Sequence, residues 1–94
     1  MTKHAESSLQ ADNERVRVTR WDFAPGASTG HHRHEYDYVV VPLTDGALRI
    51  KSADGKEHVA DLRAGVSYFR YAGVEHDVIS INDFPFSFIE IEIR

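Results

Sequence analysis

The stretch of sequence that decides the fold of this chain is Gly30-His31-His32-Arg33-His34-Glu35-Tyr36-Asp37-Tyr38-Val39-Val40-Val41-Pro42-Leu43-Thr44-Asp45-Gly46. Tyrosine and valine favour extended strands, and an Asp-Gly pair favours a tight hairpin turn because glycine accepts a positive φ without steric cost. Residues two apart in a strand project to the same face, so His32 and His34 can aim both imidazoles at one point while Arg33 faces away. The stretch therefore predicts a strand that turns into a hairpin, and its two histidines either form half of a metal site or lie at the surface of the strand end.

The remainder of the chain has the same character. Short β-favouring runs follow one another, and a second Asp-Gly pair, Asp54-Gly55, joins the runs at residues 47–52 and 57–62. No stretch is convincing as a helix. In the last run, residues 86–93, both faces are partly apolar, which indicates a closed barrel, a sandwich with a filled interior or a subunit interface. We predict an all-β domain of about seven to nine strands.

Length and composition restrict the class of protein. The chain has 94 residues, of which 41% are apolar and 28% charged, so it should hold one globular domain. We place that domain at residues 14–94. Residues 1–13 are polar and without period, which predicts a flexible tail or an arm that docks on a partner subunit.

Charge and hydropathy exclude some partners. Eleven Lys and Arg against fifteen Asp and Glu give a net charge of −4, which argues against nucleic-acid binding over the whole surface. The longest aliphatic run, residues 39–41, is too short to cross a bilayer, so we expect no membrane partner. The first residues lack the apolar stretch of a secretory signal, which predicts a cytoplasmic protein.

The histidines are the residues most informative about chemistry. The chain has no cysteine, so thiolate zinc sites, Fe–S clusters and disulfides are excluded, and His, carboxylates and Tyr are left as metal ligands. Of six histidines, four lie in two places, the segments 30–34 and 73–76.

Two spaced motifs surround these histidines. The first is Gly26, five residues, His32-x-His34 and then Gly46, and it resembles the first signature of the cupin superfamily. The second is Gly65, five residues, Tyr71-Ala72-Gly73, two residues and His76, and it resembles the second cupin signature, with Tyr71 in place of the usual Pro and Ser80 in place of the usual Asn. Two half-motifs in the right order are more specific than either one alone.

The resemblance extends from Arg15 to Glu92 and implies a particular fold. Cupins have a double-stranded β-helix, a small jelly-roll barrel, whose ligands line the inside near the mouth. Within the superfamily, residues 32–46 look like the small single-domain cupins grouped with β-alanine-degradation proteins. The resemblance therefore implies an all-β jelly-roll cupin barrel that binds a metal ion.

One departure from the family pattern changes the expected site. The first cupin motif usually supplies a Glu three or four residues after the second His, and here those positions are Tyr38 and Val39. Strand parity puts Tyr36 and Tyr38 on the face of His32 and His34 unless a bulge intervenes. We expect a metal site of three histidines, with Tyr38 as a fourth ligand or as a neighbouring catalytic proton donor. The expected ligands are His32, His34 and His76.

This ligand set predicts the type of chemistry. Three neutral imidazoles leave a divalent ion with its full charge, which favours an anionic, chelating ligand such as a carboxylate. Imidazole suits Zn, Fe, Ni and Cu alike, so the ligand type does not name the metal, and we expect a divalent transition metal such as Fe, Ni, Zn or Mn. The resemblance implies an enzyme with dioxygenase-like or Lewis-acid chemistry on a small organic molecule, in a homodimer. The alternatives are a binding or sensing cupin without turnover and a metal-free structural cupin.

Other polar residues have two interpretations each. Glu75 either orients His76 or is solvated, and Glu90 and Glu92 either line the cavity or, as we expect, lie at its rim. Arg49 and Arg70 either anchor an anionic substrate or are exposed strand residues. His31 is expected to face away from the metal, and His4 and His58 to be exposed.

Overall fold

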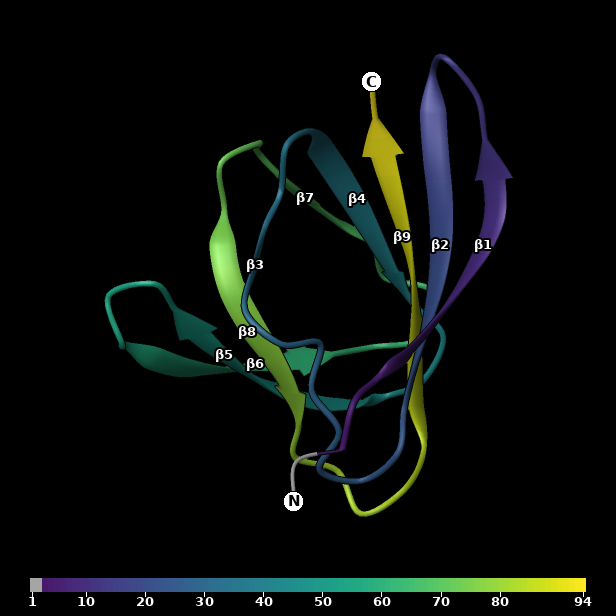
Figure 1. Ribbon diagram of the computed structural model, residues 1–94. Coiled ribbons are helices and arrows are strands. Elements are labelled where there is room, and N and C mark those ends of the chain that lie inside the picture. Colours follow the sequence, from purple (N-terminus) through teal and green to yellow (C-terminus); the bar gives the residue numbers. More distant parts are fainter. Residues whose placement is uncertain (1–2) are drawn as a thin grey trace.

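The computed structural model describes residues 3–94 and consists of strands and turns (Figure 1). The first two residues of the predicted tail lie outside the described residues. None of the described elements is a helix long and apolar enough to cross a membrane. The nine strands are β1 (Glu6–Asp12), β2 (Val16–Phe23), β3 (His32–Arg33), β4 (Asp37–Pro42), β5 (Gly46–Ser52), β6 (Glu57–Leu62), β7 (Tyr68–Arg70), β8 (Glu75–Ser80) and β9 (Phe86–Ile93).

Two antiparallel sheets face each other and enclose the core. One sheet has the order β1-β2-β9-β4-β7 and the other β3-β8-β5-β6. In Figure 1, β5, β6 and β8 lie across the interior from β2, β4 and β9. The predicted all-β double-stranded β-helix is therefore confirmed, and both faces of a strand such as β9 are partly apolar because one face lines the interior.

The two Asp-Gly pairs behave differently. Gly55 has a φ of 86° and closes the predicted hairpin between β5 and β6. The prediction of a hairpin at Asp45-Gly46 is wrong, because β4 and β5 belong to different sheets and the chain crosses between them there. Gly46 is needed for its lack of a side chain, since a Cβ on it would lie 2.7 Å from Oδ1 of Asn82 and 2.8 Å from Cδ2 of Phe86.

The interior of the barrel divides into an apolar end and a polar end. Phe23, Leu48 and Phe86 are almost fully buried at the apolar end, where the Phe23 and Phe86 rings meet edge to face with centroids 6.3 Å apart. Along β9 the inward face continues from Phe86 and Phe88 to two buried glutamates, Glu90 and Glu92. The carboxylates of Glu90 and Glu92 therefore lie inside the barrel, whereas the sequence analysis expected them at its rim.

The N-terminal segment forms more regular structure than the sequence predicts. Residues 6–12 form β1, which pairs along β2 with a register shift between Leu9 and Ala11, and every residue of β1 is exposed. Ala5 is buried, and its N–H donates to the carbonyl of Ser28. A flexible tail is therefore the wrong description of residues 6–12, whereas an arm that contacts a second subunit stays a prediction.

Candidate metal centre

Pairing between β3 and β8 brings the two histidine motifs together. His32 and His76 are register partners in that pair. His34 follows β3 directly, and its backbone N–H donates to the carbonyl of Val74 at 2.8 Å while the Gly73 N–H donates to the His34 carbonyl, also at 2.8 Å. The tight Gly73 turn, with a φ of 96°, thus holds the second motif against the first although 42 residues separate His34 from His76.

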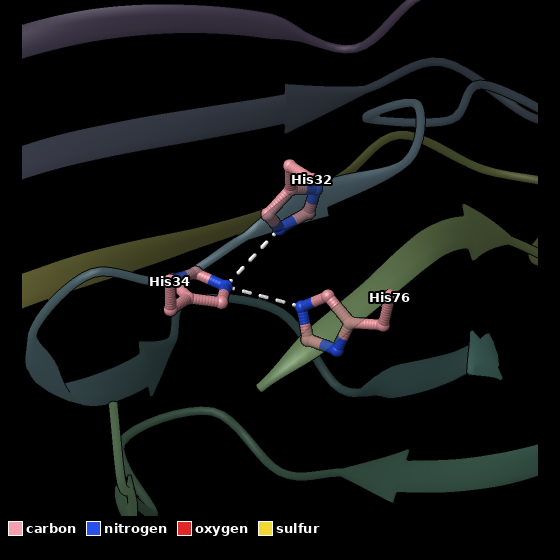
Figure 2. Close-up of side chains that lie close together, drawn as sticks. All are labelled: His32, His34 and His76. Atoms are coloured by element: carbon pink, nitrogen blue, oxygen red, sulfur yellow. Dashed lines mark hydrogen bonds between the residues drawn. The ribbon is translucent and has the colours of Figure 1, made fainter. Parts of the chain in front are cut away.

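The three imidazoles point their Nε2 atoms toward one another (Figure 2). Nε2 of His34 lies 3.1 Å from Nε2 of His32 and 3.1 Å from Nε2 of His76. The ring centroids are 4.7 to 5.1 Å apart, and the planes are steeply inclined to one another. One nitrogen from each of the three predicted ligands therefore lies within 4.8 Å of the others.

The hydrogen bond of Nδ1 determines which nitrogen of the His32 ring carries the proton. Nδ1 of His32 lies 2.9 Å from the carbonyl oxygen of Gly30, which can only accept, so Nδ1 carries the proton and donates it. The hydroxyl of Thr29 is 3.2 Å from the same nitrogen. Nε2 of His32 is consequently the unprotonated nitrogen, with its lone pair directed at the cluster.

Glu90 lies behind His34. Its Oε1 is 3.4 Å from Nδ1 of His34, and both residues are 8% exposed. A carboxylate in this position favours a proton on Nδ1, the tautomer in which Nε2 of His34 is free to bind a metal ion. Strand alternation along residues 86–93 could indicate from the sequence that Glu90 faces the interior. No feature of the sequence indicated that Thr29 would contact His32.

The donor set fits a divalent transition-metal ion. Two lone pairs 3.1 Å apart repel each other unless a cation or a proton lies between them. The two separations of 3.1 Å, from Nε2 of His34 to Nε2 of His32 and of His76, are short enough for metal–nitrogen bonds of about 2.1 Å to meet at one ion. The cluster is therefore compatible with a metal site.

Protons are poor substitutes for a metal ion in this cluster. Burial is the main reason that the pKa of His76 falls to about 3, and charge repulsion from His32 and His34 adds to it. Burial also lowers the pKa of His32 below its ordinary value. Neutral imidazoles are the metal-binding form, so these two residues stay available as ligands in mildly acidic solution.

Tyr38 lies beside the cluster, as the sequence predicts, and Tyr36 does not. The Tyr38 ring is 3% exposed and stacks on His34, with ring centroids 3.9 Å apart and planes 19° from parallel. Burial raises the pKa of the Tyr38 phenol above its ordinary value, so the group keeps its proton. The strand is interrupted between β3 and β4, and Tyr36 lies under the guanidinium of Arg94, 5.8 Å from the ring centroid.

The cluster borders a cavity and two further depressions. The cavity has a volume of about 30 Å³ and is lined by the three histidines, Thr29, Tyr38 and Glu90, among others. Two depressions of about 390 Å³ also reach the histidines. We call them the β2 cleft, bordered by Arg17, Trp21, His32, His34 and Glu90, and the β7 groove, bordered by Tyr38, Tyr68, Arg70 and His76.

The remaining candidates are resolved by their contacts. Glu75 accepts from Nε2 of His31 at 2.7 Å, so its partner is His31 rather than His76. Glu92 forms a two-point ion pair with Arg17, at 2.7 and 3.1 Å. His4 and His58 are exposed, as the sequence analysis expects, and the structure also exposes His31, Arg49 and Arg70.

Comparison with protein families and curated proteins identifies relatives over most of the chain. The family model described as the cupin domain matches residues 19–92. A curated relative, the beta-alanine degradation protein BauB of Pseudomonas aeruginosa, is 54% identical over 90 residues, which cover 96% of this chain and 94% of the relative.

Solved structures match the fold. A cupin domain from Bordetella pertussis Tohama I is 50% identical and superposes with a TM-score of 0.96 over 100% of this chain and 97% of its own. An uncharacterised protein with a double-stranded β-helix domain from Klebsiella pneumoniae subsp. pneumoniae is 20% identical and superposes with a TM-score of 0.78. It covers 96% of this chain and 76% of its own, and it supports the fold alone.

Proposed function

This chain belongs to the cupin domain family, and from that premise we propose that it is a cytoplasmic metal-dependent enzyme that acts on a small anionic or chelating organic molecule. The observation that carries the proposal is the convergence of three imidazole Nε2 atoms in a buried, polar end of the barrel. The ligands would be His32, His34 and His76, and the metal Fe, Ni, Zn or Mn.

The chain's own residues have distinct roles in this proposal. The Gly30 carbonyl would orient His32 through its hydrogen bond to Nδ1, and the nearby Glu90 carboxylate would favour the same tautomer of His34, so that each presents an unprotonated Nε2. A bound divalent ion supplies Lewis acidity and open coordination positions for a chelating oxygen or nitrogen donor. Tyr38 holds a proton on its hydroxyl beside His34, which makes it the candidate catalytic proton donor.

The substrate class follows from charge and from the relative. Three neutral ligands leave the positive charge of the ion uncancelled by direct coordination, so an anionic donor binds best. The relative in Pseudomonas aeruginosa is named for β-alanine degradation. We therefore place the substrate among the small carboxylates formed when a β-amino acid is broken down.

Metal analysis tests the proposal. Protein purified without a histidine tag is loaded separately with Fe(II), Ni(II), Zn(II) and Mn(II), desalted and analysed for metal. We expect the wild type to retain about one ion per chain, His34→Ala and His76→Ala to lose it, and His58→Ala, an exposed control, to match the wild type. A wild type that retains none of the four metals would overturn the metal site.

A second candidate is a cupin that binds a small molecule without turnover. It is favoured by the largely apolar surface of the cavity beside the histidines, whose lining includes Leu48, Val78 and Phe88, as is typical of small-molecule binding sites. Oxygen consumption and product analysis on metal-loaded protein, with β-alanine, 3-hydroxypropanoate and malonate, distinguish the two. Conversion of any of them supports the enzyme, and binding without conversion supports the binding module.

We also infer a homodimer through the outer face of the larger sheet. An apolar row crosses four strands in register, from Val18 to Ile91, Val39 and Phe69, and Phe69 is 42% exposed. An apolar row of this kind on an outer sheet face is typical of subunit contacts. We expect light scattering to give a dimer for the wild type and a monomer for Ile91→Asp, with Glu57→Gln on exposed β6 as the control. A monomeric wild type would overturn the dimer.

A further inference from the structure

The β7 groove carries a positive charge beside the histidine cluster. Arg70 and Tyr68 share one face of β7, and the guanidinium carbon of Arg70 lies 4.9 Å from the centroid of the Tyr68 ring. The same groove is bordered by Tyr38 and His76. A guanidinium packed on an aromatic ring is held in place, with its remaining N–H groups available to a ligand.

Arg70 is not neutralised within the part of the chain that the structure describes. Four other arginines there lie within 4.0 Å of a carboxylate, and Arg70 does not, its hydrogen bond being to the Phe69 carbonyl at 3.2 Å. The β2 cleft holds two arginines, Arg17, which is bound by Glu92, and Arg33, which is exposed on β3. Arg70 differs from Arg17 because it has no carboxylate partner, and from Arg33 because its guanidinium packs on the ring of Tyr68.

The field of Arg70 reaches the site itself. Burial and the neighbouring histidines are the main causes that lower the pKa of His76, and the positive charge of Arg70 adds to them. Burial is the main cause that raises the pKa of Tyr38, and the charge of Arg70 opposes that rise. Geometry agrees, because Tyr38 and Arg70 are register partners in the pair of β4 and β7, and both border the β7 groove together with His76. A ligand bound at Arg70 would therefore lie next to His76 and Tyr38.

We propose that Arg70 determines substrate specificity by binding the carboxylate of a small monocarboxylate in the β7 groove, while the other end of that molecule reaches the histidine cluster. This inference rests on the proposed function and names the end of the substrate that lies away from the metal. Arginine is suited to the task because its planar fork donates two parallel hydrogen bonds to a carboxylate.

The other charged groups along the groove restrict the substrate to one carboxylate. Asp61 and Glu75 also border the groove, and Glu75 is already paired with His31. A second carboxylate on the substrate would meet these like charges, which disfavours its binding. A monocarboxylate whose second group is an oxygen donor such as a hydroxyl, which can bind a metal ion and carries no second carboxylate, is therefore favoured over a dicarboxylate.

Binding measurements on metal-loaded protein test the inference. The probes are 3-hydroxypropanoate and its neutral amide, titrated by calorimetry and by the fluorescence of Trp21, the single tryptophan, which lines the cavity. We expect Arg70→Gln to weaken carboxylate binding about tenfold or more and to leave amide binding unchanged, and Arg70→Lys to have a smaller effect. Arg49→Gln, which removes an exposed arginine on β5, should match the wild type.

The outcomes separate this inference from the proposed function. Arg70 is not a metal ligand, so Arg70→Gln should retain the same metal content as the wild type, which also serves as a check on its folding. Equal carboxylate affinity in Arg70→Gln and wild type overturns the role of Arg70, as does a wild type that binds metal but no 3-hydroxypropanoate. A wild type without metal overturns the proposed function, and a tenfold effect of Arg70→Gln on the carboxylate alone would still support the inference.

Discussion

Oε1 of Glu90 lies 3.4 Å from Nδ1 of His34 in the interior of the barrel, and each residue is only 8% exposed. The carboxylate comes from the last strand, 56 residues after His34 in the chain. The first cupin motif usually places its Glu a few residues after the second His, and this chain has Tyr38 and Val39 there. This chain thus has a carboxylate near the cluster, but Glu90 lies on the Nδ1 side of His34 and not beside the Nε2 atoms.

The first prediction concerns that carboxylate. Glu90→Gln removes the negative charge that favours a proton on Nδ1 of His34, so we expect metal affinity to fall about 10- to 100-fold, measured by competition with a chromophoric chelator. The matched control is Glu92→Gln on the same face of β9, because Glu92 is paired with Arg17 and contacts no histidine. Unchanged affinity in Glu90→Gln would show that Glu90 does not tune His34.

The second prediction separates the ring of Tyr38 from its hydroxyl. Tyr38→Phe keeps the ring that stacks on His34 at 3.9 Å, so we expect metal content and thermal stability close to those of the wild type. Loss of the proton donor should lower turnover about 100-fold. Tyr36→Phe, whose ring lies under Arg94, is the control. Metal loss in Tyr38→Phe would instead identify the phenol as a ligand, and full turnover would exclude it as the donor.

Two different kinds of information predicted the histidine cluster. Strand alternation puts His32 and His34 on one face, and the resemblance to the second cupin motif implied His76, which the pairing of β3 with β8 brings to them across 42 residues. The positions of Glu90 and Arg70 were harder to predict from the sequence, because their proximity to the cluster depends on how β9 and β7 pack in the barrel. Strand alternation fixes the face of a residue, but it does not fix which end of the interior that residue reaches.

The hairpin predicted at Asp45-Gly46 and the flexible tail predicted for residues 6–12 were wrong for related reasons. An Asp-Gly pair reports local turn preference, whereas the sheet joined by the following strand depends on packing of the whole barrel. Residues 6–12 are all exposed and show no apolar pattern, because β1 is held by backbone pairing with β2 at the sheet edge. Pairing of that kind leaves little trace in residue type.

The third prediction tests the close packing at Gly46. A Cβ there would overlap Asn82, whose amide is fixed by two hydrogen bonds of 2.9 Å to the Ala47 backbone, and Phe86, which is fully buried. We expect Gly46→Ala to lower the free energy of unfolding by about 1–3 kcal/mol in urea. Gly65→Ala has backbone strain at a φ of 78° but open space around it, so it should cost about 1 kcal/mol. Equal stability of Gly46→Ala and wild type would contradict the packing.

The last prediction is a pH dependence of stability in the metal-free protein. Burial, followed by repulsion from His32 and His34, lowers the pKa of His76 to about 3 in the folded chain, against about 6.5 in the unfolded chain. Between these two values the unfolded chain binds a proton that the folded chain does not. The contribution of His76 to stability is therefore fully present above about pH 6.5 and is lost progressively as the pH falls toward 3.

The size of this effect can be isolated with a residue that does not titrate. At pH 5 the loss should reach at most about 2 kcal/mol, at roughly 1.4 kcal/mol per pH unit. Urea unfolding of chelator-treated wild type and His76→Gln should give a stability difference that changes by this amount between pH 7.5 and pH 5. His58→Gln, at an exposed position, should give a difference independent of pH. If the difference for His76→Gln is also constant, His76 takes up its proton as readily in the folded barrel as in the unfolded chain, and burial does not keep the cluster neutral.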